Sequence, residues 1–260
     1  MDYWSNKGAA SLRAKEHTER MERRYKFEIE DCVNKSVVYG EGSVNMPRPF
    51  VSMHKPRINP IVVPAKTDEA LFGLSSTDLF GNMAIARKPV ILNFASYKNP
   101  GGRFMDGSMA QEEALCHKSF LYNVLVRFGA YYDWNKEHLN RGLYLDRAIY
   151  TPNVVFFNAD DTKTTTADVL TCAAPNRSVM LRYKNATEEE NLYVLKHRVE
   201  FIRDIIGEHN VNVIILGAWG CGVFKQDPTV VSRLLSDAFA NMETVMYAIP
   251  GGENLKAFLS

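Results

Sequence analysis

Two adjacent glutamates stand where a carboxyl group can take part in acid–base chemistry. The run Gln111-Glu112-Glu113 follows Ser108, and the S-x-x-Q spacing predicts a capping box that starts a helix at or just after that serine. The first turn of a helix stabilises carboxylates by ~0.3–1 kcal/mol. Adjacent helical residues point about 100° apart, so one carboxyl can be desolvated while the other stays ionised. A carboxyl whose pKa is raised by burial can donate a proton at neutral pH. Taken alone, the run also fits an ordinary acidic first turn.

The segment before this helix has the form of an anion-binding loop. It passes from a hydrophobic strand at residues 89–94 through Gly101 and Gly102 to the helix. Such an order places backbone N–H groups and a helix N-terminus beside an anion. Asn93 and Asn99 add amide groups nearby, although asparagine and glycine are equally common in plain turns.

The same order recurs near the C-terminus. A strand predicted at residues 211–216 leads into a loop with three glycines, and Asp227-Pro228 predicts the N-cap and first residue of the next helix. The glycines are Gly217, Gly220 and Gly222. Their spacing matches neither the G-x-G-x-x-G dinucleotide fingerprint nor the phosphate loop of NTPases. We interpret the segment as a second phosphate-binding loop, with a plain glycine-rich turn as the alternative.

Hydrophobic runs alternate with helical patterns along most of the chain, which is typical of a sheet covered by helices. We expect strands at residues 61–63, 89–94, 148–156, 169–172, 211–216 and 244–249. We expect helices at residues 67–71, 110–128, 188–208 and 229–241. The strands are hydrophobic throughout, as in a sheet buried on both faces. The prediction is a three-layer α/β/α fold with a mixed sheet.

The first 60 residues differ from the rest. Residues 12–25 are charged, rich in helix formers and free of Pro and Gly, which predicts an exposed helix with a thin apolar stripe. Residues 26–38 continue that helix or form another, and glycines and prolines then punctuate residues 40–60. We expect residues 1–50 to form an N-terminal helical arm packed on a main domain of residues 51–260.

Composition excludes several classes of protein. The 31 basic and 30 acidic residues nearly cancel, so no overall field recruits nucleic acid or an anionic membrane. The four cysteines are widely separated and include no CxxC pair, which argues against a disulfide framework or a zinc knuckle. No signal-peptide core and no stretch of ~18 apolar residues is visible. We expect a cytoplasmic monomer.

A metal site finds little support in the sequence. The six histidines show no H-E-x-x-H pattern, and we expect most of them at the surface. The adjacent Asp160 and Asp161 would suit a divalent cation, but such pairs in loops are usually solvated. A metal-dependent hydrolase is therefore the weaker alternative, and we expect neither a metal nor a cofactor.

The first loop and the glutamate run together resemble a known family. The sequence N-F-A-S, N-P-G-G and Q-E-E-x-L-C, read from Asn93 to Cys116, closely resembles the signature of the macrodomain-type poly(ADP-ribose) glycohydrolases of microbial type. The similarity extends through residues 171–176, the second glycine loop and residues 253–258, and it covers most of the chain after about residue 15. It implies a macrodomain that takes ADP-ribose or ADP-ribosylated proteins and cleaves the O-glycosidic ribose bond without a cofactor.

The resemblance also implies a role for each polar residue. Glu113 would be the general acid that protonates the leaving oxygen and then helps to activate water. Glu112 would hydrogen-bond the leaving group or ribose hydroxyls, and Gln111 would support the start of the helix. Asn99 would bind hydroxyls of the distal ribose, with Asn93 as a further contributor.

Both glycine loops would hold the diphosphate, and the Phe224 ring would pack against the distal ribose and restrain the attacking water. The residues expected to bind substrate are Asn93, Asn99, Gly101, Gly102, Arg103, Gln111, Gly217, Gly220, Cys221, Gly222, Val223 and Phe224.

One residue departs from the family pattern. Where the family carries a third consecutive glycine, this chain carries Arg103, whose side chain limits positive φ and close backbone approach. Its guanidinium would either reach the diphosphate or obstruct the substrate or water. A non-catalytic ADP-ribose-binding module is therefore the alternative to an enzyme, and an interaction scaffold is a third interpretation.

Overall fold

The computed structural model describes residues 7–40, 60–75, 88–158 and 161–260. Their strands form one mixed sheet in the order β1-β4-β5-β3-β6-β7-β2. The strands are β1 (Val37–Tyr39), β2 (Ile61–Val63), β3 (Val90–Phe94), β4 (Ala148–Phe157), β5 (Thr164–Cys172), β6 (Val213–Leu216) and β7 (Thr244–Ala248). β5, β3, β6, β7 and β2 run parallel, whereas β4 is antiparallel to both β5 and β1. The carboxyl ends of five strands therefore meet at one edge.

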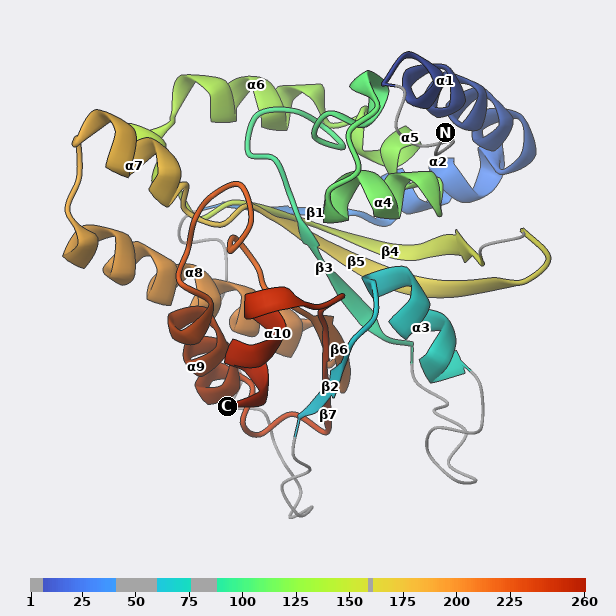
Figure 1. The fold of residues 1–260 in the computed structure, drawn as a ribbon. Helices are drawn as coiled ribbons and strands as arrows, with labels where there is room; N and C mark the ends of the chain where they lie inside the picture. The colour runs from blue at the N-terminus through green and yellow to red at the C-terminus, as the bar shows by residue number, and fades with distance from the viewer. Residues whose placement is uncertain (1–6, 41–59, 76–87, 159–160) are drawn as a thin grey trace.

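Helices cover both faces of this sheet (Figure 1). One face packs against α1 (Lys7–Arg24), α2 (Lys26–Lys35), α3 (Thr67–Ser75), α4 (Gln111–His117), α5 (Leu121–Leu125) and α6 (Gly129–Glu137). The other packs against α8 (Glu188–Glu208), α9 (Pro228–Ala238) and α10 (Gly252–Leu259). The short α7 (Arg177–Tyr183) and the 3-10 turns η1 (Phe104–Asp106) and η2 (Asn140–Gly142) lie in connecting segments.

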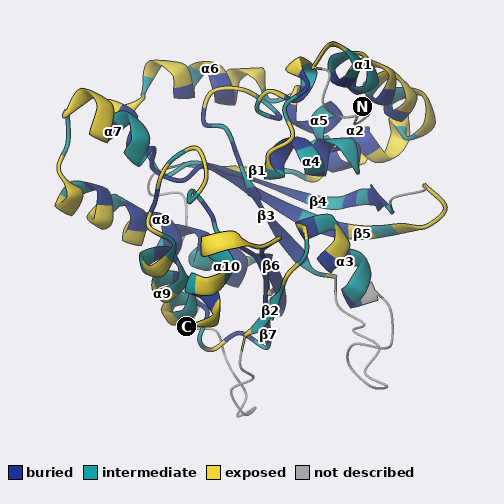
Figure 2. Ribbon diagram, viewed as in Figure 1, coloured by how far each residue is buried: buried dark blue, intermediate teal, exposed yellow. Residues whose placement is uncertain are grey.

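The side chains of the central strand β3 point alternately to the two faces of the sheet, and this explains why helices cover both faces. Ile91 belongs to the hydrophobic core on the α4 side, whereas Val90 and Leu92 belong to the core on the α8 side. All three side chains are fully buried, and Figure 2 shows the strands buried along most of their length. The hydrophobic strands predicted from the sequence are present, and β5 starts five residues earlier than its predicted range.

The predicted helix at residues 110–128 is wrong in one respect, because it is broken in two. Ser119 lies in the gap, where its hydroxyl donates to Leu115 O at 2.7 Å and accepts from Leu121 N at 3.1 Å. Serine hydroxyls that bond nearby backbone groups compete with helical hydrogen bonds. The same side chain thus ends α4 and starts α5.

The N-terminal segment is a helix, as predicted, but it is not merely exposed. Ala10, Ala14, His17 and Met21 recur at helical spacing and are buried against the rest of the protein. α2 ends at Lys35, and the β-branched pair that follows enters the edge strand β1 instead of prolonging a helix.

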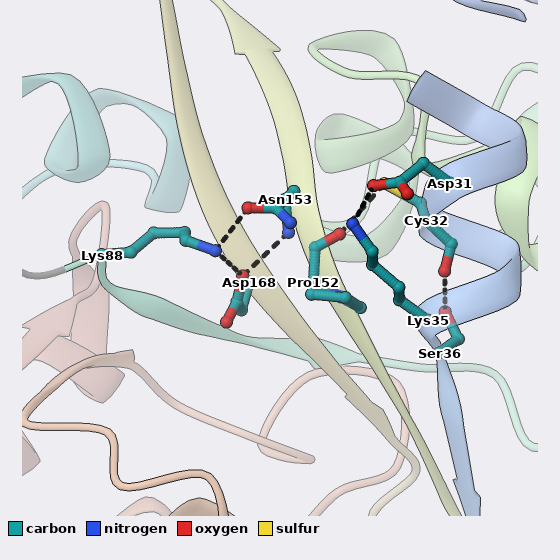
Figure 3. A network of polar contacts seen from close by, with 8 residues as sticks. All are labelled: Asp31, Cys32, Lys35, Ser36, Lys88, Pro152, Asn153 and Asp168. Carbon is teal, nitrogen blue, oxygen red and sulfur yellow. Dashed lines mark hydrogen bonds and ion pairs between the residues drawn. The ribbon is translucent and has the colours of Figure 1, made fainter. Parts of the chain in front are cut away.

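A polar network joins α2 and Lys88, which precedes β3, to the strand pair β4–β5 (Figure 3). β4 shifts register between Thr151 and Val154, and Asn153 there has a φ of 62°. Asp168 accepts from Asn153 N and from Lys88 Nζ, both at 2.8 Å. Cys32 of α2 donates its Sγ–H to Pro152 O at 3.0 Å. Asp168 pairs with Val90, the first residue of β3, so this network lies at the amino-terminal end of the parallel strands.

The prediction that most histidines lie at the surface is wrong for His17, and three other described histidines are only partly exposed. His17 is buried, and His117, His138 and His209 are half-buried, whereas His197 is exposed. His54 lies outside the described residues. The ring of His117 packs edge-on against Phe104 at 4.6 Å. Burial lowers the pKa of His117 to about 4, and nearby His17, Arg13 and Lys118 act in the same direction.

The lowered pKa of His117 predicts that the folded protein loses stability in acid. This pKa is lower in the folded protein than the ordinary value of 6.5, so the unfolded chain binds more protons between about pH 6.5 and pH 4. Unfolding in urea at pH 7 and pH 5 should show a loss of roughly 1–2 kcal/mol attributable to His117, after allowance for its exposed part. His117→Gln should reduce the difference between the two pH values, and an unchanged difference would refute this assignment.

No helix in the described ranges is long and apolar enough to cross a lipid bilayer. No group of three or more His, Cys, Asp or Glu side chains in these ranges is arranged to hold a metal ion. Of the aspartates considered for a cation, Asp160 lies outside the described residues, and Asp161 pairs with Arg20 at 3.3 Å.

Candidate active site

A cavity of about 640 Å³ opens at the carboxyl ends of the parallel strands. Its walls come from the segments that follow β2, β3, β5, β6 and β7, together with the first turn of α4. In open α/β sheets ligands bind in this crevice, where loops from several strands converge. The topology therefore brings the glutamate run and the second glycine loop to one site.

Glu112 is held by hydrogen bonds to both of its carboxyl oxygens. Oε2 accepts from Ser96 N at 2.7 Å, and Oε1 accepts from Asn93 Nδ2 at 3.3 Å. The residue is 3% exposed. Burial raises the pKa of Glu112 from its ordinary 4.5 to about 8, against the hydrogen bonds from Ser96 and Asn93, which favour the charged form. Glu112 is therefore largely protonated at neutral pH.

Glu113 is also buried, but one of its oxygens has no protein partner. Oε1 accepts from Arg103 N at 2.9 Å. Within the described part of the chain, Oε2 accepts no hydrogen bond. Both glutamates line the cavity. Of the two, Glu113 is the carboxyl that keeps an oxygen available to a ligand.

The first glycine loop fits closely around these carboxyls. Gly101 and Gly102 have φ values of 63° and 62°, which favour glycine. A Cβ at Gly102 would lie 2.6 Å from Oε1 of Glu113 and 2.9 Å from Oε2 of Glu112. A Cβ at Gly101 would meet the Tyr122 ring at 2.6 Å. The glycines therefore let the loop wrap the two carboxyls.

Arg103, which replaces the third glycine, takes an ordinary backbone conformation. Its φ is −114°, so this position does not require glycine. The side chain is exposed, and its Nε donates to Asp106 Oδ2 at 3.1 Å. The expected restriction of the backbone at Arg103 is thus absent, and the guanidinium lies at the rim of the cavity in an exposed ion pair.

Gln111 does not complete a capping box, which corrects the prediction at Ser108. α4 begins at Gln111 after Ala110, and no side chain caps it. Instead, the Gln111 amide accepts from Phe94 N at 2.9 Å and donates to Leu92 O at 3.0 Å. This pairing with the backbone of β3 fixes the first turn of α4 against the end of the strand.

The second glycine loop combines close packing with free backbone donors. A Cβ at Gly217 would lie 2.7 Å from Ala248 O, and Gly220 has a φ of 76°. Among the loop residues whose N–H groups donate no hydrogen bond within the described part of the chain are Gly220, Gly222, Val223 and Phe224. These four residues line the cavity. Such free donors suit an anion.

The N–H groups of the first loop are already engaged. Arg103 N donates to Glu113, Gly102 N donates to Asn99 O at 3.1 Å, and the Gly101 N–H favours the charged form of Glu112. The two loops therefore differ: the first binds the carboxyls of Glu112 and Glu113, and the second has backbone N–H groups that are free to bind a ligand.

Aromatic stacking supports Phe224 from behind. Its ring packs edge-on against Tyr144 at 6.1 Å, and Tyr144 stacks on Tyr97 at 4.2 Å. Tyr97 is buried, and Asn135 donates to its carbonyl at 2.8 Å. The Phe224 ring therefore packs against Tyr144, which the buried Tyr97 holds in place.

Most residues predicted for the site reach the cavity. Lining it are Glu112, Glu113, Asn99, Gly102, Arg103, Gln111, Gly220, Gly222, Val223 and Phe224. Four others do not line it: Asn93, Gly101, Gly217 and Cys221. Asn93 is fully buried and touches Glu112, so its place is to orient that carboxyl.

Two further parts of the cavity wall were not predicted from the sequence. One is the segment Lys66, Thr67 and Asp68 at the start of α3, and the other is the turn from Ala248 to Gly251 with Asn254 after β7. Both follow parallel strands, so the carboxyl-end rule would have indicated them once the strand order was known. A buried arginine was also missed: Arg198 of α8 pairs with Asp146 and donates to Ala173 O at 2.7 Å, beside the cavity.

The protonation of Glu112 predicts an unusual pH dependence of stability. Because its pKa is raised in the folded state, the unfolded chain releases this proton first, and stability falls as the pH rises from about 4.5 to about 8. Glu112→Gln should remove this loss and stabilise the protein by roughly 4 kcal/mol at pH 8, with little change at pH 4.5. Thermal unfolding at both pH values checks this, and a pH-independent difference would contradict it.

A mixed α/β sheet with two buried carboxyls in the crevice at its strand ends has the groups that carboxylate-dependent glycoside hydrolysis uses. Comparisons with known proteins identify the chain further. Residues 8–159, more than half of the chain, match the family model described as the catalytic domain of microbial-type PARG, or poly(ADP-ribose) glycohydrolase. The chain belongs to this family, and it is poly(ADP-ribose) glycohydrolase-like in function.

Solved structures give the same result over nearly the whole chain. Poly(ADP-ribose) glycohydrolase from Thermomonospora curvata, bound to the inhibitor ADP-HPD, is 28% identical with a TM-score of 0.80, over 97% of this chain and 98% of that one. The enzyme from Deinococcus radiodurans, in complex with ADP-ribose, is 25% identical with a TM-score of 0.70, over 88% and 95% of the two chains. A search of curated proteins gave no match.

Proposed function

We propose that this enzyme hydrolyses the O-glycosidic ribose bond of ADP-ribose units attached to one another or to protein, and releases ADP-ribose. The observation that carries the proposal is the buried pair of carboxyls at the first turn of α4, next to four free N–H groups of the second glycine loop. A ligand that joins an anionic diphosphate to a ribose would fill both parts of one cavity. The neutral form of Glu112 at pH 7 reduces repulsion of such an anion.

The chemistry follows that of other glycoside hydrolases. The Glu113 carboxyl donates its proton to the leaving oxygen as the bond from that oxygen to the anomeric carbon breaks, through an oxocarbenium-like transition state. Water then adds to the anomeric carbon, and the Glu113 carboxylate takes up the released proton. The free Oε2 of Glu113 supports its choice as the acid, because both oxygens of Glu112 are already hydrogen-bonded.

The other residues orient the substrate in this proposal. Asn99, at the cavity wall, binds hydroxyls of the distal ribose, and Asn93 acts from behind by holding Glu112. The loop from Gly217 to Phe224 binds the diphosphate through its free N–H groups. The Phe224 ring, supported by Tyr144, packs on the distal ribose and restrains the attacking water.

We further propose that the domain is a macrodomain of residues 51–260 with an N-terminal arm of residues 1–50. The order of the parallel strands and the helices on both sheet faces support a three-layer arrangement. In this proposal the arm supplies α1, α2 and the edge strand β1, and its helices pack beside α5. The protein acts on its substrate as a monomer.

Release of ADP-ribose tests the proposed activity. The protein is incubated with poly(ADP-ribose) and, separately, with mono-ADP-ribosylated protein, and free ADP-ribose is measured by liquid chromatography. Release from either substrate is expected at a rate proportional to the enzyme concentration. Binding of ADP-ribose without any release would contradict hydrolysis.

A non-catalytic module that binds ADP-ribose is the second candidate, and the observation in its favour is Arg103 at the cavity rim. Under this alternative the arginine obstructs the scissile bond or the water, and Arg103→Gly restores hydrolysis to an inactive protein. If the wild-type protein is active and Arg103→Gly changes its rate little, the alternative is excluded.

A further inference from the structure

The far side of the second glycine loop is held by residues outside the cavity. The loop closes on itself where Gln226 N donates to Gly220 O at 3.0 Å. The buried side chain of Gln226 exchanges hydrogen bonds with Asn191 of α8, at 2.7 and 3.1 Å. Ser178 N, in the first turn of α7, donates to Phe224 O at 3.0 Å. The loop is therefore fastened to α7 and α8.

Arg177 makes the charged part of this attachment. Its Nη1 donates to Lys225 O at 2.8 Å, at a residue whose φ is 61°. The same guanidinium forms a two-pronged ion pair with Glu188 in the first turn of α8, with Nε–Oε2 and Nη2–Oε1 distances of 2.8 and 2.6 Å. Fork-like pairing of this kind fixes the orientation of an arginine. The guanidinium thus ties the start of α8 to the loop backbone.

A second ion pair in the same region serves as an internal comparison. Arg141 Nη2 pairs with Glu190 Oε1 at 2.9 Å, and Nη1 donates to Asn185 O at 3.0 Å. This pair also joins a preceding segment to the first turn of α8, although the Arg141 side chain is 49% exposed and that of Arg177 is 28% exposed. In the described part of the chain, no hydrogen bond or ion pair joins Arg141 to the loop of residues 217–226. Removing the Arg141–Glu190 pair therefore removes a surface ion pair at the start of α8 without releasing the loop.

We propose that Arg177 is a positioning residue that holds the second glycine loop in the conformation whose N–H groups face the cavity. The inference rests on the proposed function for its effect on catalysis. The diphosphate is held equally in the ground state and the transition state, so a loosened loop weakens substrate binding more than it slows the chemical step. Phe224 keeps its own supports, Ser178 N and Tyr144, so the placement of the water is retained.

The test compares Arg177→Gln with the matched variant Arg141→Gln. For Arg177→Gln we expect KM for poly(ADP-ribose), and Kd for ADP-ribose by calorimetry, to rise about tenfold while kcat stays within about twofold. For Arg141→Gln we expect KM and kcat of the wild type. A KM for Arg177→Gln within twofold of the wild type, or the same rise in both variants, would overturn the proposal.

Amide hydrogen exchange of the free protein supplies a readout that needs no substrate. The amides of Cys221, Lys225 and Gln226, which donate hydrogen bonds within the loop, should exchange at least several-fold faster in Arg177→Gln than in the wild type, whereas Arg141→Gln should leave them unchanged. Unaltered exchange in Arg177→Gln would also overturn the proposal. If the wild-type protein releases no ADP-ribose, the proposed function fails, and the exchange measurement still decides the role of Arg177.

Discussion

Replacing Glu113 by glutamine should lower the rate of ADP-ribose release by about 10³-fold, within the range usual for a general acid. The amide keeps the shape of the side chain and can still accept the hydrogen bond from Arg103 N, but it cannot deliver a proton. Affinity for ADP-ribose should therefore stay within about threefold of the wild type. Steady-state kinetics and calorimetry on the same preparation measure both quantities.

Glu112→Gln distinguishes the two carboxyls. Glu112 carries the raised pKa, but both of its oxygens are occupied by Ser96, Asn93 and the loop backbone. We therefore expect a smaller fall in rate for this variant than for Glu113→Gln. Glu16→Gln, at an exposed position of α1, is the neutral control. If Glu112→Gln is inactive and Glu113→Gln is not, the acid has been assigned to the wrong residue.

Gly102→Ala should reduce the rate of release by at least about 100-fold while the protein remains folded. The new Cβ would lie 2.6 and 2.9 Å from oxygens of Glu113 and Glu112, closer than van der Waals contact, and would displace them; misplacement of catalytic groups by about 1 Å can cost such a factor. Forcing alanine to a φ of 62° costs about 1–2 kcal/mol of stability. Kinetics and urea unfolding measure the two effects.

Gly129→Ala is the matched control for this variant. Gly129 is exposed at the start of α6, no atom lies within 4 Å of a Cβ placed there, and its φ is not in the positive range. Activity and stability should both remain close to the wild type. If Gly102→Ala is as active as Gly129→Ala, the first loop does not fix the carboxyls in the way proposed.

The strands and the two glycine loops were predictable because their signals are local. Hydrophobic runs such as residues 213–216 and the Asp227-Pro228 cap depend on neighbouring residues, and Asp227 does accept from Thr229 N at 2.8 Å. The edge strand β1 and the break at Ser119 were missed because they depend on partners far along the chain. β1 exists through its pairing with β4, and Phe157 N donates to Lys118 O within the break.

Which residues belong to the site was easier to predict from the sequence than the hydrogen bonds and burial of each residue. The sequence places Gln111 three residues after Ser108, yet the Gln111 amide bonds to β3, because the loop brings the strand end within reach. Both glycine loops have the composition of phosphate loops, and only the hydrogen bonds separate them. The raised pKa of Glu112 depends on burial that the sequence does not specify.

The orientation of ADP-ribose in the cavity is the central claim, and a crystal structure of Glu113→Gln soaked with ADP-ribose tests it most directly. We predict that the diphosphate accepts hydrogen bonds from the N–H groups of residues 220–224. We predict also that the anomeric carbon of the distal ribose lies next to residue 113, with Phe224 against the ribose ring. A diphosphate bound elsewhere, or a distal ribose turned away from residue 113, would contradict the account.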